Sequence, residues 1–335
     1  MDFDFSEDQL ALREGARELL DGLASPAQVR AHTTSGAAFD ARLWQAMVDQ
    51  GWLGIEVDEA NGGLGLGTVE SALLVEELGR HAAPAPFVST VLALDALPLT
   101  HPLRDRVLAG DAIPCVAWDP TAPVVYAPSA QLAIVLAPDG VYATGLEASP
   151  KREPAMDLTR ELGWLDVDLA HATKIGGDDA RTRLLNRGAM FASAELLGSS
   201  SRALDMAVEY AKDRVQFGRP IGSFQAVKHR CADMLVDVEG MRSTVYWAAW
   251  SIGANDADAS VAASAAKVWC GDASKRVMAS ALQVHGGIGF TWEHDLHFFM
   301  KRAQLDQLAF GDASFHRARL TSLLRPRVEA GESVV

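Results

Sequence analysis

The sequence predicts a mainly α-helical protein with a small β domain in its middle. Apolar residues recur at helical spacing towards both ends of the chain, whereas the stretch 110–177 contains short apolar runs separated by Pro, Asp and Gly. With 335 residues, of which 49% are hydrophobic, the chain has ample material for a buried core. This composition excludes an intrinsically disordered protein.

The N-terminal region, residues 1–109, is predicted to form a helical domain. Ser6 is a good N-cap for a first helix, because it directly precedes an acidic turn and a stripe of Leu and Ala residues. Further helices are expected over 41–50 and 68–81. The glycine-rich loop 61–67 lies between them and is expected either to turn the chain or to contact a substrate.

The middle region, residues 110–177, is predicted to form the small β domain. Apolar runs at 113–118, 132–136 and 141–144 are the expected strands. Asp-Pro and Pro-Asp-Gly sequences follow the first two runs and are typical of turns.

The C-terminal region, residues 178–325, is predicted to form an antiparallel four-helix bundle. Long segments rich in Ala and Leu alternate here with glycine-containing breaks. The four expected helices cover 179–212, 223–253, 257–284 and 295–324. The polar remainder, 326–335, is predicted to be a flexible tail.

The net charge of −14 argues against nucleic acid or an anionic membrane surface as the main partner. The chain has three scattered cysteines without a CxxC pair, so a cytoplasmic protein without a disulfide framework is expected. His294 and His297 are three residues apart and are expected to share a helix face, but no third ligand is spaced to join them. We therefore expect no metal site.

Two C-terminal segments carry the strongest functional pattern. Residues 213–225 read DRVQFGRPIGSFQ, and residues 283–290 read QVHGGIGF. Glycines at a helix end let the backbone approach a ligand, and Arg214 and Gln216 add a cation and an amide. This combination suits a pyrophosphate held between helices. Taken alone, the same residues are also compatible with a helix C-cap and a surface arginine.

In their order over nearly the whole chain, these two segments and the opening MDFDFSEDQLALREGAREL resemble the acyl-CoA dehydrogenase family. The resemblance implies that family's fold: a helical N-terminal domain, a β middle domain and a C-terminal four-helix bundle. It also implies α,β-dehydrogenation of an acyl-CoA thioester with noncovalent FAD, and an electron-transfer flavoprotein as the electron acceptor. By the same resemblance, the residues that reach the FAD of a neighbouring subunit are Arg214, Gln216, Phe217, Gln283, Gly286 and Gly287.

The sequence departs from the family at the catalytic base. In the common form of the family the base is the Glu of a Tyr-Glu-Gly, and here Phe310 stands in that position before Gly311. A phenyl ring cannot accept a proton. A minority of the family places the base at a position that corresponds to Gly188 or Ala189, where no carboxylate is found. Glu195 lies about two turns further along the same predicted helix, so it is a poor substitute.

The middle region is also shorter than the resemblance predicts. The family's Thr-Glu-x-x-x-Gly-Ser-Asp and Trp-Ile-Thr-Asn segments, which surround the flavin ring, are absent between residues 110 and 177. In this respect the chain resembles the base-lacking chain of two-chain, α2β2 acyl-CoA dehydrogenases of actinobacterial steroid side-chain breakdown. The resemblance implies a partner chain that carries the base, and a bulky acyl-CoA, such as a steroid side-chain CoA ester, as substrate.

Two alternatives remain open from the sequence. In the first, the chain is a self-sufficient homo-oligomeric dehydrogenase in which Asp312 is the base, although an N-cap role for Asp312 is the favoured interpretation. In the second, the chain is a non-catalytic flavin-binding subunit that scaffolds or regulates a partner. A hydrolase or acyltransferase is disfavoured because the sequence contains no Gly-x-Ser-x-Gly.

Overall fold

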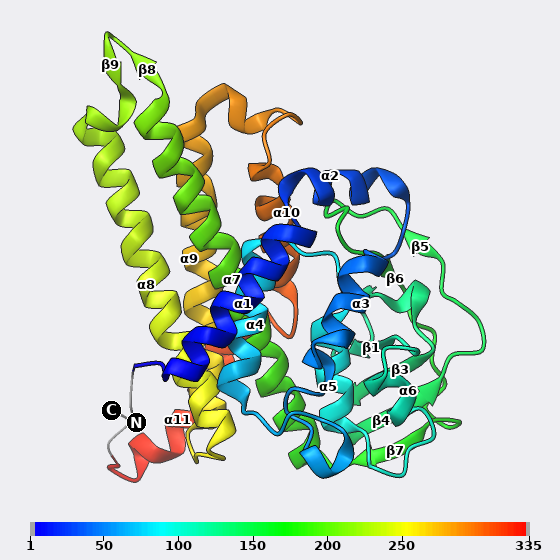
Figure 1. Cartoon of the computed structure of the whole chain (residues 1–335). Coiled ribbons are helices and arrows are strands. Elements are labelled where there is room, and N and C mark those ends of the chain that lie inside the picture. The colour runs from blue at the N-terminus through cyan, green and yellow to red at the C-terminus, as the bar shows by residue number, and fades with distance from the viewer. Residues whose placement is uncertain (1–3, 333–335) are drawn as a thin grey trace. The chain divides into compact units, whose positions relative to one another are not determined.

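The computed structural model describes residues 4–332, and its helices and strands occur in the predicted order (Figure 1). The chain divides into two compact units. The first comprises Met1–Ser71 and Ala83–Gly188, and the second comprises Ala72–Ala82 and Ala189–Val335. The helical N-terminal region, the small β region and the helical C-terminal region of the mainly α prediction are confirmed. The finer division into three domains and a tail stays a prediction.

The first unit begins with helices. Ser6 caps α1 (Glu7–Leu23) through a capping box, since its side chain accepts from the backbone N–H of Gln9 and the Gln9 side chain accepts from the N–H of Ser6. The helices expected over 41–50 and 68–81 are confirmed. The helical elements that follow α1 are α2 (Pro26–Ser35), α3 (Ala41–Asp49), η1 (Trp52–Gly54), η2 (Glu59–Asn61), α4 (Thr68–Arg80), α5 (Phe87–Ala96) and α6 (Arg104–Leu108).

The glycine-rich loop folds back on the segment that precedes it. The N–H groups of residues 64, 65 and 66 donate to the carbonyls of Gly54, Val57 and Ile55 at 2.8–2.9 Å. A Cβ atom on Gly63 would collide with the backbone carbonyls of Gly54 and Val57, so only glycine fits there. The loop therefore acts as a turn whose hydrogen bonds fix the conformation of the preceding segment. A substrate contact of this loop stays a prediction.

The small β region contains two sheets, and the three predicted strands are confirmed as β1 (Pro114–Ala117), β3 (Leu132–Ala137) and β4 (Gly140–Gly145). The four-stranded sheet has the order β1-β3-β4-β7, with β1 and β3 parallel and the other pairs antiparallel; β7 covers Thr173–Gly176. The three-stranded sheet consists of β2 (Val124–Val125), β6 (Leu162–Gly163) and β5 (Arg152–Glu153), and η3 (Ala127–Ser129) follows β2. Small buried residues, among them Cys115, Ala117 and Ala133, form the core beside β1 and β3.

The second unit contains the long helices of the C-terminal region. The first three predicted segments are confirmed as α7 (Asp178–Asp213), α8 (Gln225–Gly253) and α9 (Ala259–His285); the second unit includes α7 from Ala189 onward. Between α7 and α8 lie β8 (Val215–Gln216), β9 (Arg219–Pro220) and η4 (Ile221–Ser223), and η5 (Gly286–Phe290) follows α9. The inward face of α9 is rich in alanine, which lets α8 and α9 pack closely along their length.

The fourth predicted segment, 295–324, is not one helix. It is divided into α10 (Leu296–Leu308) and α11 (Ala313–Glu329). The break occurs because Phe310 and Gly311 both have positive φ, 55° and 96°, which no α-helix accommodates. Residues 326–329, which were predicted to belong to the flexible tail, are helical because α11 continues to Glu329. Residues 333–335 lie outside the described part of the chain.

Helices α4 and α7 cross at two glycines within the second unit. A Cβ on Gly79 would collide with the backbone of Glu195, and a Cβ on Gly198 would collide with the backbone of Glu76. The hydroxyl of Ser199 on α7 donates to the carbonyl of Gly79 on α4 at 3.1 Å, and this hydrogen bond stabilises the contact between the two helices. This close approach holds the buried carboxylate of Glu195 in a fixed position.

Candidate functional site

The first predicted cofactor-binding segment forms a short hairpin after α7. Phe217 and Gly218 both have positive φ, 52° and 78°, and make the turn between β8 and β9. The N–H of Ile221 donates to the carbonyl of Arg214 at 2.7 Å and closes the hairpin at its base. Arg214, Gln216 and Phe217 are exposed, and Phe217 is 92% accessible. The hairpin therefore presents all three candidate residues to the outside.

The second predicted segment ends α9. Gly286 has a φ of 62°, which a residue with a side chain adopts only under strain, so glycine ends the helix here. A Cβ on Gly286 or Gly287 would meet no atom within 4 Å, and Gln283 is exposed. The backbone of this turn is thus open to a molecule that approaches it.

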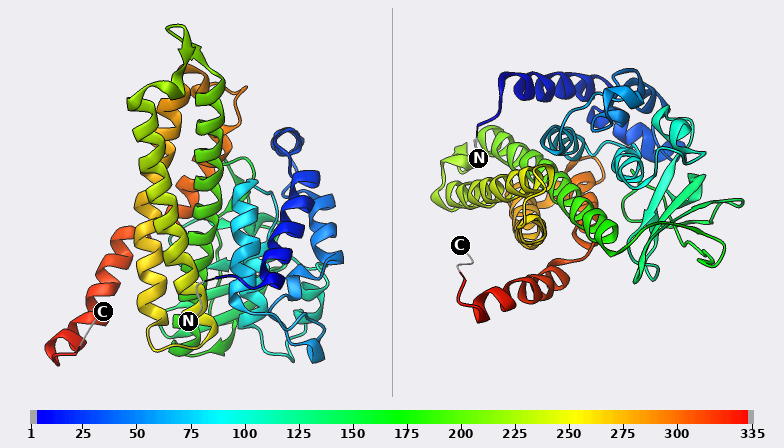
Figure 2. Two further views of the ribbon diagram at one scale, coloured as in Figure 1. Left: turned by 60° about the vertical axis from the view of Figure 1, so that its left-hand side comes forward. Right: turned by 90° about the horizontal axis from the view of Figure 1, so that it is seen from below.

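The two segments lie at the same end of the second unit. Helix α8 runs antiparallel to α7 and α9, so the end of α7, the start of α8 and the end of α9 meet there; the green hairpin and the orange turn share one end in the left view of Figure 2. The rings of Tyr210 on α7 and His285 on α9 stack at 4.9 Å. The six residues singled out from the sequence therefore gather at one end of the bundle.

This end of the second unit has the chemistry of a surface that another molecule covers. The guanidinium of Arg214 has no ion-pair partner within the part of the chain that the structure describes. Large apolar side chains of the hairpin and of the turn after α9 are exposed, namely Val215, Phe217, Ile288, Phe290 and Trp292. An unpaired cation beside open glycine backbone can hold an anion such as a pyrophosphate, and the apolar side chains can pack against a ring or a second protein.

Phe310 is the residue at which the sequence resemblance predicts that the catalytic base is missing. Its side chain is buried, and its positive φ turns the chain between α10 and α11. The Nε2–H of His316 donates to the carbonyl of Phe310 at 2.9 Å. The turn is therefore well ordered around a phenyl ring that has no acid–base function.

Asp312 is the N-cap of α11. One oxygen of its carboxylate accepts from the backbone N–H of Phe315 at 2.8 Å. This is the N-cap predicted from the sequence, and it gives the exposed carboxylate a structural role at the helix start, where the helix dipole also favours a negative charge.

Glu195 is buried in an ion pair. Its Oε1 lies 2.7 Å from Nη1 of Arg302, and the two side chains are 5% and 0% exposed. Arg302 also donates through Nη2 to the carbonyl of Ala82 at 3.2 Å. A carboxylate held in this way neutralises the buried arginine. That Glu195 is a poor base stays a prediction.

Lys267 is a buried charged residue that the sequence reasoning missed. Its Nζ donates to the backbone carbonyls of Asp306 and Gln307 at 2.9 Å each, at the C-terminal end of α10. Burial lowers the pKa of Lys267 to about 8, against the opposing attraction of the Asp306 carboxylate. The lysine thus fixes the end of α10 directly before Phe310. The available signal was a lysine directly after the alanine-rich stretch 262–266 of α9.

His316 makes the stability of the second unit sensitive to acid. Burial lowers its pKa to about 4, whereas the unfolded side chain titrates near 6.5. The unfolded state therefore binds the proton first, and the stabilisation is lost as the pH falls from about 6.5 towards 4. We expect the titration of His316 to lower the unfolding free energy by about 2 kcal/mol as the pH falls from 7 to 5. Urea titrations of the wild type and His316→Gln at both pH values measure it; parallel pH dependences in the two proteins would contradict the assignment.

The histidines near the end of α9 pack against other rings. His294 precedes α10 rather than lying on it, so the expectation that it shares a helix face with His297 is wrong. The helix starts later because residues 291–295 form a turn. The ring of His294 contacts that of His285 at 4.4 Å, and the ring of His297 contacts that of Trp292 at 4.9 Å. Over residues 4–332, no three potential metal ligands gather in one place.

Comparison with known proteins identifies the family. The N-terminal domain of acyl-CoA dehydrogenases matches residues 6–101, and the C-terminal domain of acyl-CoA dehydrogenases matches residues 176–322. The chain therefore belongs to the acyl-CoA dehydrogenase family, whose members typically bind FAD. Within the described residues, no helix is both long enough and apolar enough to cross a lipid bilayer.

Individual relatives match over most of the chain. The acyl-CoA dehydrogenase IpdE2 of Mycolicibacterium smegmatis is 38% identical over 89% of this chain and 93% of its own length. The ChsE4–ChsE5 complex from Mycobacterium tuberculosis contains a chain that is 29% identical, with a TM-score of 0.86 over 97% of this chain and 99% of that one. The Tcur3481–Tcur3483 steroid ACAD G363A variant contains a chain that is 28% identical, with a TM-score of 0.90 over 96% of this chain and 99% of that one.

Proposed function

We propose that this chain is one subunit of a two-chain, FAD-dependent acyl-CoA dehydrogenase, in which it completes the FAD site of a partner chain that carries the catalytic base. The observation that carries the proposal is the exposed group of Arg214, Gln216 and Phe217 beside Gly286 and Gly287 at one end of the second unit. In an isolated chain the exposed guanidinium of Arg214 is hydrated, and against an anionic cofactor in a second chain it can form a charge-assisted ion pair instead.

The state of the carboxylates supports the second half of the proposal. Phe310 stands where the family's common base would be, Asp312 caps a helix and Glu195 neutralises a buried arginine. Phe310 is not a carboxylate, and the two carboxylates already have structural roles, so none of the three side chains is free for proton transfer. The similarity to chains from two-chain complexes supports a hetero-oligomer, and the steroid enzyme among them supports a steroid-derived acyl-CoA as substrate.

The residues at this end fit an FAD that a neighbouring chain would hold. Arg214 would pair with the pyrophosphate, and the open backbone at Gly286 and Gly287 would let the cofactor approach. Gln216 and Gln283 would offer amide hydrogen bonds, and Phe217 would cover apolar surface of the cofactor and exclude water. The bound flavin would supply the hydride-accepting chemistry. In this proposal the chain binds and orients the FAD and shields it from water.

The flavin content of the purified chain tests the proposal. We expect the chain alone to be colourless, and to yield a yellow and active complex only when it is co-expressed with a second acyl-CoA dehydrogenase-like chain. Visible absorbance per chain and reduction by an acyl-CoA are the two readouts. Stoichiometric FAD in the isolated chain, with bleaching by an acyl-CoA, would overturn the proposal.

Two variants of Asp312 separate the proposal from the self-sufficient enzyme. Asp312→Asn keeps an acceptor for the Phe315 N–H but cannot serve as a base, so the active complex should keep its turnover. Asp312→Ala should lower the unfolding free energy by about 1 kcal/mol and leave turnover unchanged in the folded complex. If Asp312→Asn folds normally and abolishes turnover, the carboxylate is the base and the two-chain proposal fails.

A further inference from the structure

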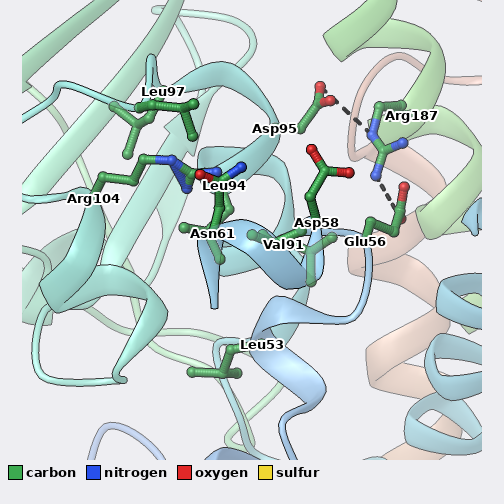
Figure 3. Close-up of a pocket in the computed structure, with 12 residues that line it drawn as sticks. Leu53, Glu56, Asp58, Asn61, Val91, Leu94, Asp95, Leu97, Arg104 and Arg187 are labelled. Carbon is green, nitrogen blue, oxygen red and sulfur yellow. Dashed lines mark hydrogen bonds and ion pairs between the residues drawn. The ribbon is translucent and has the colours of Figure 1, made fainter. Parts of the chain in front are cut away.

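The first unit contains a cavity that the proposed function does not use. It has a volume of about 310 Å³ and lies among η1, η2, α5 and α6 (Figure 3). Leucine and valine side chains from η1, α5 and the segment after α5 form its apolar walls. The volume equals that of about ten liquid waters, which is at the lower end of the range for small-molecule sites.

Arg104 is the unusual residue in this cavity. The residue is only 8% exposed, and its Nη1 atom is buried and has no hydrogen-bond partner among residues 4–332. The part of the chain that the structure describes places no carboxylate within ion-pair distance of it. Figure 3 shows its side chain directed towards Leu94 and Asn61, into the cavity. A buried Nη1 group without an acceptor is unfavourable, and the guanidinium as a whole has no counter-ion, so Arg104 favours an anion that enters the cavity.

The second arginine of the cavity is already neutralised. The Nη2 atom of Arg187 lies 2.7 Å from Oε1 of Glu56, and its Nε lies 3.7 Å from Oδ2 of Asp95 (Figure 3). Burial alone would raise the pKa of Glu56, but the charge and hydrogen bond of Arg187, together with hydrogen bonds from Ser71 and Thr68, outweigh burial and lower it. Glu56 is therefore ionised at neutral pH, and Arg187 is not available for a ligand.

The remaining charges limit the ligand to one negative charge. Arg104 supplies a single unpaired cation, and the exposed carboxylate of Asp58, also in the lining, disfavours a dianion such as phosphate. The apolar walls favour a hydrocarbon body behind the charged group. We propose that this cavity binds a small monocarboxylate with an apolar body, and that Arg104 holds its carboxylate while Asn61 lies beside it.

Calorimetric titration of the full-length chain with hexanoate tests this site. We expect one hexanoate per chain and at least tenfold weaker binding to Arg104→Gln. Arg106→Gln is the matched control, because Arg106 lies on the same short helix but is exposed, and its hexanoate affinity should equal that of the wild type. No binding to the wild type, or equal affinity of Arg104→Gln and the wild type, overturns the proposal.

Two further measurements test the site even if Arg104→Gln does not fold. Hexanamide has the same hydrocarbon body without the charge, and it should bind the wild type at least tenfold more weakly than hexanoate. Leu99, which lines the cavity and is 60% exposed, can be replaced without opening the core; Leu99→Trp should fill the entrance and abolish hexanoate binding. Equal affinities for the acid and the amide, or unchanged hexanoate binding by Leu99→Trp, would refute the site.

Discussion

Replacing Arg214 by Gln in the active two-chain complex is expected to weaken FAD binding by between tenfold and a hundredfold. The guanidinium is exposed and has no ion-pair partner among residues 4–332, so its loss should leave the fold unchanged. A hydrogen bond to a charged group contributes about 1.5–3 kcal/mol, which corresponds to that range. Fluorescence titration of the cofactor-free complex with FAD measures the change.

Lys212→Gln is the matched control for Arg214→Gln. Lys212 is an exposed cation two residues earlier, in the last turn of α7, and its replacement removes the same charge from the same region. The FAD affinity of the complex with Lys212→Gln should stay within about twofold of the wild type, because salt screens a long-range charge effect. If Arg214→Gln also leaves FAD affinity and turnover unchanged, the chain acts as a scaffold and the shared-site proposal is wrong.

Arg302→Met is expected to lower the unfolding free energy by about 3–5 kcal/mol, since it leaves the buried carboxylate of Glu195 without its counter-ion. The double variant Glu195→Gln with Arg302→Met removes both charges and should recover a large part of that loss. Urea unfolding of the four proteins of this cycle gives the coupling free energy of the pair.

Arg317→Met provides a surface reference for this cycle. Arg317 pairs with Asp272, and its side chain is 54% exposed, so its replacement should cost less than about 1 kcal/mol. A similarly small effect of Arg302→Met would mean that Glu195 finds another partner or takes up a proton. In that case Glu195 would return as a candidate for acid–base chemistry.

Local signals predicted many of the elements correctly. Ser6 with Gln9 is a capping box that lies within four residues of sequence, and the strands at 132–137 and 140–145 are apolar runs joined by a Pro-Asp-Gly turn. Such features depend on neighbours along the chain, so a single sequence is enough to find them.

Sequence reasoning missed three features of the fold, and only the first of them lacks a local signal of this kind. Helix α5 is buried on nearly every side, so it shows no amphipathic stripe and its apolar run is ambiguous. The break at Phe310 was missed because helical spacing continues across it, although Gly311 followed by Asp312 is a stop-and-cap signal. Helix α2 also went unpredicted, although Ser25 before Pro26 marks its start.

The sequence by itself determined the family resemblance, the order of helical and β regions, and the six residues predicted to contact FAD, because these depend on residue types and spacing. Only the tertiary structure decided which charged groups are free. It pairs the buried Glu195 with Arg302 and the buried Arg187 with Glu56. It also leaves Arg214 exposed and the buried Nη1 atom of Arg104 without an acceptor. Those pairings join residues more than 100 positions apart, and a charge acts on its surroundings in space rather than along the chain.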